Sequence, residues 1–166
     1  MDFRKLEGLL DSFLDLGIPG VDCMVYCHGQ PVFRHMAGYA DQEAKAPVTE
    51  KTLWYLYSAT KVVTCTAALM LYEEGKFLLD DPLSDYMPEF SSMTVRKEDG
   101  SVKPAKRPIL IGDLFSMTAG FSYRMDTPKL LEGVAATKGK APLREMMKYL
   151  AKEPLSFEPG ENWQYS

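Results

Sequence analysis

The 166-residue sequence has few histidines and cysteines and no long hydrophobic run, and each shortage excludes a class of protein. The longest uncharged stretch after Lys61, residues 62–72, is too short to span a bilayer. Charged side chains among residues 1–7 stand where a secretory signal needs an apolar run. We therefore expect a cytoplasmic protein with no membrane segment, or a periplasmic or secreted one if a signal peptide was removed.

The three cysteines and two histidines give little support for a disulfide scaffold or a metal site. An odd set, Cys23, Cys27 and Cys65, favours a reducing compartment. Cys23, Cys27 and His28 are neighbours in sequence, but residues 23 and 27 of an extended strand lie far apart, and no second ligand pair exists. His35 has no obvious acidic partner nearby, which argues against a Ser-His-Asp triad. We expect no metal and no organic cofactor.

An excess of basic residues is also absent, since 23 acidic side chains outnumber 19 basic ones. A nucleic-acid-binding protein needs a basic surface, so nucleic acid is not an expected partner. The sequence contains no glycine-rich phosphate loop, internal repeat or low-complexity segment. Its hydrophobic share of 46% and charged share of 25% are typical of a globular protein, and its length allows one domain or one and a half.

The first half of the chain predicts a helix, a hairpin and a second helix. Apolar residues at helical spacing predict an amphipathic helix over residues 3–16. Residues 21–27 and 32–40 flank a turn at residues 28–31 and predict an antiparallel hairpin. The segments that follow are a polar loop over 41–51, a short aromatic strand over 52–57 and an apolar helix over 59–74, with Gly75 placed as its C-cap glycine.

The second half predicts mostly short helices. The expected elements are a helical turn over 80–88, a solvated hairpin over 96–107, and helices over 111–117, 129–137 and 142–152. The sequence predicts one hairpin and at most two further short strands, whereas a lone hairpin is marginal in water and a sheet normally needs three or more strands with a covered face. The chain is therefore interpreted as the first part of a larger α/β unit.

The most informative residue is a lysine in the apolar helix. Lys61 is the only charged residue between Lys51 and Glu73, and a helix that is apolar nearly all round is expected to be buried. A buried ammonium finds a partner or loses its proton, and a neutral lysine can accept a proton from a hydroxyl. Ser58 offers that hydroxyl, about 5–6 Å away at Cβ on the same helical face. It also stands at the helix start, where free backbone N–H groups favour negative charge.

A plainer interpretation of the same tetrad stays open at this point. Ser58 could be an ordinary N-cap residue, and the Lys61 side chain could extend along the helix to place its ammonium in water. A bare Ser-x-x-Lys spacing also occurs often by chance, so the context of the motif has to decide.

Five segments in order resemble one family. Ser58-Ala59-Thr60-Lys61 resembles the active-site tetrad of the penicillin-recognising serine hydrolases, in the branch of class C β-lactamases, D-alanyl-D-alanine carboxypeptidases and β-lactamase-like esterases. Residues 74–83 resemble the "Gly … Leu-Asp-Asp-Pro" stretch after the catalytic helix, and residues 86–90 continue it. Residues 111–121 are similar to "Ile-x-Asp-Leu-Leu-x-His-Thr-Ser-Gly-Leu", and residues 154–166 resemble the run that ends in the second motif, Tyr-x-Asn.

The resemblance implies a fold and three site residues. The fold would be an α/β, β-lactamase/transpeptidase-like one, with an antiparallel sheet flanked by helices and a mostly helical subdomain, incomplete in this chain. Residues 1–80 would be the N-terminal part of the α/β domain, with the catalytic helix, and residues 81–166 the first part of the helical subdomain. Ser58 would be the acylated nucleophile, Lys61 would help to deprotonate it, and Tyr165 would act as general base or proton shuttle.

Two departures from the family pattern matter. Met117 stands where the family commonly has histidine, at a position we expect to be structural. The Asn of Tyr-x-Asn would be the residue after Ser166, and the third-motif strand, which supplies an oxyanion-hole N–H besides that of Ser58, is also outside the chain. We expect a complementary C-terminal fragment to complete the domain, and the 166-residue chain to be inactive by itself.

The main hypothesis is a serine hydrolase that cleaves an ester or amide through an acyl-serine intermediate. Its substrate would be a small-molecule ester, a β-lactam or a D-amino-acid peptide. The alternative is a non-catalytic, penicillin-binding-like protein that binds peptide or β-lactam ligands without turnover. Acyl turnover separates the two.

Overall fold

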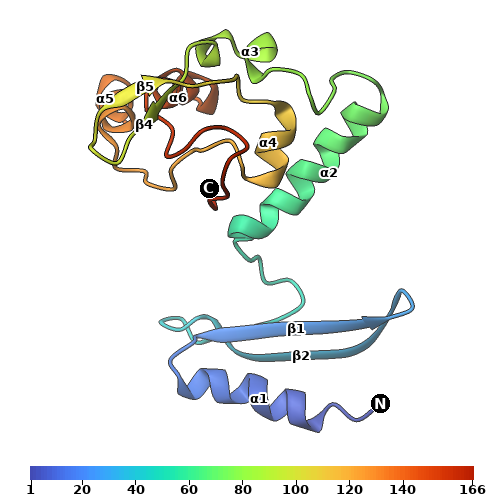
Figure 1. The fold of residues 1–166 in the computed structure, drawn as a ribbon. Coiled ribbons are helices and arrows are strands. Elements are labelled where there is room, and N and C mark those ends of the chain that lie inside the picture. The colour runs from blue at the N-terminus through green and yellow to red at the C-terminus, as the bar shows by residue number, and fades with distance from the viewer. The chain divides into compact units, whose positions relative to one another are not determined.

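The computed structural model describes residues 1–166, which form two compact units, residues 1–57 and 58–166 (Figure 1). The first unit contains α1 (Arg4–Asp15), β1 (Gly20–Cys27), β2 (Gln30–Asp41) and β3 (Ala46–Pro47). A 3₁₀ turn, η1 (Tyr57–Ala59), leads into the second unit, which contains α2 (Thr60–Glu73), α3 (Leu83–Tyr86), η2 (Pro88–Phe90), β4 (Thr94–Arg96), β5 (Val102–Pro104), α4 (Ile111–Ser116), α5 (Pro128–Ala136) and α6 (Leu143–Leu150). None of these helices has the length and apolar character needed to cross a bilayer.

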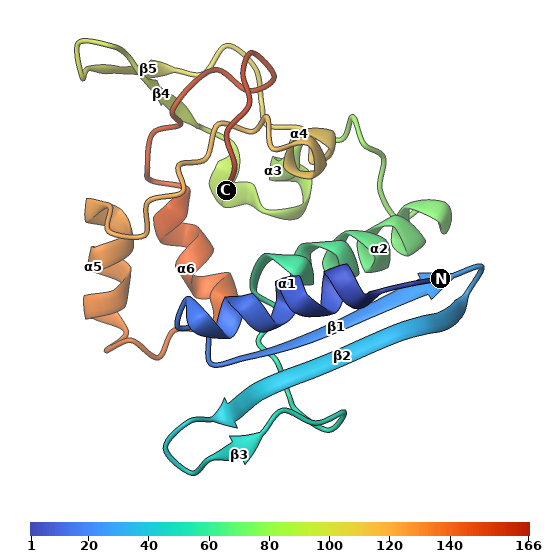
Figure 2. The ribbon, with the colours of Figure 1, turned by 90° about the horizontal axis from the view of Figure 1, so that it is seen from below.

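The first unit is a helix packed on a three-stranded antiparallel sheet. The sheet has the order β1-β2-β3, and Figure 2 shows α1 lying along the β1–β2 hairpin. The predicted helix and hairpin are thus confirmed, and the predicted loop contributes a short third strand. The turn is tighter than expected, because His28 and Gly29, both with positive φ, make the whole connection. Two such residues match the right-handed twist of the strands.

His35 has acidic partners, contrary to the expectation from sequence. Its Nε2 lies 2.7 Å from Asp11 Oδ1, and its Nδ1 lies 3.6 Å from Glu7 Oε1. Both acids are on α1, so the packing of the helix on β2 creates a contact that local sequence does not show. The Phe3 and Phe33 rings, stacked at 4.8 Å, join the same two elements.

The aromatic segment before Ser58 is not a strand, so that prediction is wrong. Residues 51–56 have no regular secondary structure, and the Leu53 side chain is 95% exposed. Aromatic and apolar residues favour a strand only where a neighbouring strand takes up their backbone hydrogen bonds, and none does so here.

The core of the second unit is built around the β4–β5 hairpin. Ile109 and Leu155 are almost completely buried and pack with other apolar side chains, Leu83, Phe90, Met93, Val95 and Ala119. Leu155 continues the sheet, because its N–H donates to Thr94 O and its carbonyl accepts from Arg96 N–H. The predicted hairpin and three later helices are confirmed, although the hairpin buries one face rather than being fully solvated.

The helix α2 begins and ends close to the predicted positions, but it is not buried. It contains no buried residue, and Val62 is 71% exposed. On one side its residues line an apolar cavity of about 290 Å³ together with Phe77 and α4. The helix ends at Glu73, and Gly75 follows its C-cap residue Glu74 with a φ of 68°, which suits the glycine predicted to terminate the helix. The expectation that burial of α2 removes Lys61 from water is therefore wrong for this chain.

Two glycines of the first unit, Gly8 and Gly29, provide a test of the two-residue turn between β1 and β2. A Cβ added to Gly8 or to Gly29 meets no atom within 4 Å, so only the backbone differs between the two positions. We expect Gly29→Ala, at φ 77°, to destabilise the unit by about 1–2 kcal/mol. Gly8→Ala, in the middle of α1, is expected to stabilise it by about 0.5–1 kcal/mol.

Urea unfolding followed by circular dichroism measures both glycine variants. Opposite shifts of the midpoint support the two-residue turn at His28 and Gly29. Equal shifts in the same direction contradict it.

Candidate active site

Ser58 lies in η1, on the turn that enters α2. The preceding residue, Tyr57, has a φ of 46°, which is uncommon for a residue with a large side chain. Such conformations are found where the surrounding structure requires a sharp change of chain direction. The helix N-cap is Ala59, without a side-chain cap, so Ser58 is not the ordinary capping residue of the plainer interpretation.

The Lys61 ammonium lies between two hydroxyl groups. Its Nζ donates to Ser58 Oγ at 3.3 Å and to Tyr165 Oη at 3.1 Å. Lys61 is half-buried, like Cys65 and Ala68, whereas the other residues of the helix are exposed. The structure therefore turns the lysine head toward these hydroxyls, and the interpretation in which it extends into water is not supported.

The Tyr165 phenol has a lowered pKa. The Ser58 hydroxyl and then the Lys61 ammonium, as hydrogen-bond donors, lower the pKa of the Tyr165 phenol, while partial desolvation opposes them. Lys61 Nζ also lies 4.6 Å from the centre of the Tyr165 ring, which adds a cation–π contact. All three residues predicted from sequence are thus brought together.

A segment without regular secondary structure carries Tyr165 to Lys61. Residues 156–166, here called the C-terminal strap, run beside residues 117–120 and bond to them three times. Ser156 N–H donates to Gly120 O at 2.7 Å, Gly160 N–H to Thr118 O at 2.8 Å, and Gln164 N–H to Met117 O at 3.1 Å. The last bond stands one residue before Tyr165, so the strap is held almost to its end.

Met117, which stands where the resembling family commonly has histidine, makes its contacts through its backbone. It has a φ of 59° and ends α4 in the left-handed conformation. Its carbonyl accepts from Gln164 N–H. The expectation of a structural position agrees with these contacts.

Tyr123 is a neighbour of the site that sequence reasoning missed. Its ring centre lies 5.5 Å from that of Tyr165. It comes from the loop between α4 and α5, where one tyrosine carries no motif or periodic signal. Only the tertiary contact with Tyr165 marks it.

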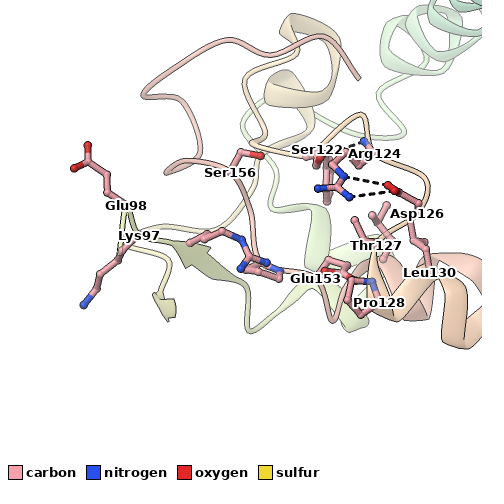
Figure 3. Close-up of a pocket in the computed structure, with 14 residues that line it drawn as sticks. Lys97, Glu98, Ser122, Arg124, Asp126, Thr127, Pro128, Leu130, Glu153 and Ser156 are labelled. Carbon is pink, nitrogen blue, oxygen red and sulfur yellow. Dashed lines mark hydrogen bonds and ion pairs between the residues drawn. The ribbon is translucent and has the colours of Figure 1, made fainter. Parts of the chain in front are cut away.

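A large cavity of the second unit does not contain these residues. It measures about 770 Å³ and is lined from β4, the loop after α4, the start of α5 and the segment from the end of α6 onward, as Figure 3 shows for Ser122, Thr127 and Glu153. Positive and negative side chains are equally numerous around it, and Arg124 is already paired with Asp126. A lining of this kind favours neither an anionic nor a cationic ligand. The candidate site is therefore assigned to Ser58, Lys61 and Tyr165, which contact one another.

No metal centre is formed by the side chains of residues 1–166. Cys23, Cys27 and Cys65 are free thiols, and no group of three or more His, Cys, Asp or Glu residues is placed to hold an ion. The geometry instead brings together the Ser58 hydroxyl, the Lys61 amino group and a Tyr165 phenol of lowered pKa.

Comparison with known proteins agrees with this geometry. The family model described as Beta-lactamase matches residues 5–166. The chain belongs to the beta-lactamase family. It is 34% identical to esterase EstB of Burkholderia gladioli over all of this chain and 43% of that protein. It is also 34% identical to lovastatin esterase of Penicillium rubens, over 73% of this chain and 32% of that protein.

Solved structures place the chain in the β-lactamase/transpeptidase-like fold, as predicted. The hydrolase EstCE1, described as having promiscuous acyltransferase activity, superposes with a TM-score of 0.79 at 30% identity, over 98% of this chain and 43% of that one. A penicillin-binding protein homologue from Pyrococcus abyssi has the same fold, with a TM-score of 0.72 at 23% identity, over 99% of this chain and 36% of that one. The chain therefore spans less than half the length of these beta-lactamase-family proteins.

The first test of the site is the titration of its phenol. We expect Tyr165 to ionise below the ordinary tyrosine pKa of about 10, because Ser58 and Lys61 stabilise the phenolate. Lys61→Met removes the cation and is expected to raise the pKa of Tyr165 toward that value. Tyrosinate absorbance measured against pH checks this, with Tyr165→Phe identifying the titration.

The lowered pKa of Tyr165 also makes the stability of the folded protein depend on pH. A folded-state pKa below the unfolded one means that the phenolate favours the folded protein. The stabilisation is complete above the unfolded pKa and is lost as the pH falls through the folded one.

The control for the titration is Lys138→Met, at an exposed lysine, which is expected to leave the pKa of Tyr165 unchanged. If both lysine variants titrate like the unmodified chain, the contact between Lys61 and Tyr165 is absent in solution.

Proposed function

We propose that this chain carries the nucleophile and proton-transfer groups of a serine hydrolase that cleaves an ester or amide through an acyl-Ser58 intermediate. The observation that supports this most directly is the single ammonium, Lys61 Nζ, within 3.3 Å of Ser58 Oγ and 3.1 Å of Tyr165 Oη. Membership of the beta-lactamase family agrees with it.

The proposed acylation step uses all three residues. Ser58 Oγ attacks the substrate carbonyl carbon while its proton passes to the Tyr165 phenolate, whose basic form is maintained at lower pH by the Lys61 charge. The carbonyl oxygen becomes an oxyanion near the Ser58 backbone N–H at the start of α2, where free N–H groups favour negative charge. Collapse of this intermediate breaks the bond to the leaving group, which takes the proton back from Tyr165.

Deacylation reverses the roles. Water attacks the acyl-Ser58 carbonyl, gives its proton to Tyr165, and the proton then returns to Ser58 Oγ as the acid product leaves. Lys61 stays charged in this scheme and acts by electrostatic stabilisation of the phenolate. In the alternative scheme expected from the sequence, a neutral Lys61 amine accepts the Ser58 proton directly.

The proposed substrates are small-molecule esters first, with β-lactams and D-amino-acid peptides as the other members of the class. The two relatives at 34% identity are both called esterases, which favours the ester. The amide substrates place a higher demand on protonation of the leaving group, for which Tyr165 is the available acid.

Completion by a C-terminal portion is part of the proposal. The exposed apolar side chains of α2, among them Val62, Val63 and Met70, form a surface that a separate soluble unit seldom leaves open. The relatives continue well beyond the matched region, since the chain spans 43% of esterase EstB. We propose that the corresponding C-terminal portion covers α2 and supplies the second oxyanion donor.

The test of catalysis uses the chain completed by the C-terminal portion of esterase EstB. We expect turnover of a chromogenic short-chain ester and, at a lower rate, of a chromogenic cephalosporin. Ser58→Ala abolishes turnover and the mass increase of the acyl-enzyme. Tyr165→Phe lowers kcat by about 10²–10⁴-fold, the usual contribution of general acid–base catalysis.

The control for the nucleophile is Ser91→Ala, which changes another exposed serine and is expected to keep full activity. Stoichiometric binding of the cephalosporin without turnover supports the alternative, a binding protein that does not catalyse. Equal turnover by the unmodified protein and by Ser58→Ala contradicts the proposed nucleophile.

The test of completion measures exchange of α2 amides. In the 166-residue chain we expect the exposed helix to exchange hydrogen rapidly, and in the completed protein to be protected. Hydrogen exchange followed by mass spectrometry compares the two. The α1 segment, which already packs on its own hairpin, serves as the internal reference. Identical α2 exchange in both proteins would contradict the covering role.

A further inference from the structure

We propose that Arg107, Asp113 and Thr118 are positioning residues that hold Tyr165 beside Lys61. This inference rests on the proposed function for its catalytic consequence, but its structural part is tested separately. None of the three residues contacts Ser58, Lys61 or Tyr165 by a hydrogen bond, so they act through the C-terminal strap.

The first step is the dependence of the strap on the turn of residues 117–120. The strap has no helix or strand of its own, and its three backbone bonds end on Met117, Thr118 and Gly120. The position of Tyr165 is therefore set by the conformation of this turn. Gly120 fits the close approach, because a Cβ there would lie 2.6 Å from Phe157 O.

The second step is the attachment of the turn to Asp113. Thr118 Oγ1 donates to Asp113 Oδ1 at 3.1 Å, and Thr118 N–H donates to Asp113 O at 2.9 Å. Ser116 Oγ lies 2.7 Å from Thr118 Oγ1 and extends the hydroxyl network. These bonds stabilise the left-handed Met117 residue between Ser116 and Thr118, which a long unbranched side chain adopts only at a cost.

The third step is the burial and pairing of Asp113 itself. Its residue is 7% exposed, and its carboxylate accepts from both terminal nitrogens of Arg107, at 2.8 and 2.9 Å, and from Leu110 N–H at 2.8 Å. Burial alone would raise the pKa of Asp113, but the hydrogen bonds from Arg107, Leu110 and Thr118 outweigh it and lower the pKa. The carboxylate thus stays charged and oriented.

The fourth step is a direct contact between Arg107 and the strap. Gly160, with a φ of 81°, lies so close that a Cβ on it would be 2.0 Å from Arg107 Nη2. The same guanidinium therefore pairs with Asp113 and forms the surface on which the strap lies. Two routes therefore connect the ion pair to the strap at Gly160, one through Thr118 O and one by direct contact with Arg107, while Met117 holds Gln164 next to Tyr165.

The consequence for catalysis follows from the geometry of the site. If the turn loosens, the strap keeps its sequence but no longer places Tyr165 Oη at 3.1 Å from Lys61 Nζ. Misplacement of a reacting group by about 1 Å is able to reduce a rate by about 10²-fold. The expected defect is therefore in kcat, with KM little changed.

The experiment compares Thr118→Val with Thr118→Ser. Valine removes the Oγ1 bond to Asp113 at nearly constant volume, whereas serine keeps the hydroxyl. In the 166-residue chain, we expect Thr118→Val to move the titration of Tyr165 most of the way back toward its ordinary pKa, and Thr118→Ser to restore it. In the completed enzyme, we expect Thr118→Val to lower kcat by about 10²-fold, and Thr118→Ser to recover most of it.

Two controls keep the result specific. Thr137→Val removes a similar hydroxyl bond, from Thr137 Oγ1 to Gly133 O at 2.7 Å, in α5. Arg144→Gln breaks the ion pair with Glu89, away from the strap. Both are expected to leave the Tyr165 titration unchanged. Asp113→Asn is the second variant and, where it folds, is expected to behave like Thr118→Val.

The outcomes distinguish a failure of the positioning role from a failure of the proposed hydrolase function. An unchanged Tyr165 titration in folded Thr118→Val overturns the positioning role, whatever the activity. An equal shift in Thr137→Val also overturns it, because the effect is then a general loss of stability. A shifted titration together with an unmodified protein that never forms acyl-Ser58 supports the positioning role and rejects the hydrolase.

Discussion

The ammonium group of Lys61 lies between the hydroxyls of Ser58 and Tyr165, and this contact places two demands on the rest of the chain. The lysine and serine must be three residues apart at the start of a helix, which η1 and α2 provide by local geometry. The tyrosine must return from the far end of the sequence to the same place. Local structure cannot meet that second demand, so it depends on the second unit's core and on the C-terminal strap.

The strap is held in a way that differs from a helix or strand. Its bonds are few and spaced, and they end on a turn that contains a left-handed methionine. The turn is attached through Thr118, whose hydroxyl and backbone N–H both donate to Asp113, and the buried Asp113 carboxylate is itself paired with the partly exposed Arg107. Only the carboxylate of this pair is buried, and leaving it without its partner would be costly, so the pair is suited to specifying one geometry.

The helix α2 is less buried than its sequence predicts. Its apolar composition suits a helix covered on several sides, yet it contains no buried residue. Lys61 is nevertheless half-buried, and its Nζ contacts both the ring and the hydroxyl of Tyr165. The environment of the lysine is thus created by one long-range contact, and the apolar helix around it contributes less than its composition suggests.

Sequence by itself determined the parts of this protein that depend on near neighbours. The spacing of Ser58 and Lys61, the α1 helix, the hairpin and the glycine end of α2 follow from periodicity and from residues that favour turns, since these interactions act over a few residues. The tertiary structure alone decided the pairing of His35 with Asp11, the loss of a strand before Ser58 and the exposure of α2. It also decided how Tyr165 is held, because contacts across 104 residues depend on the packing of the whole unit and leave no periodic signal in the chain.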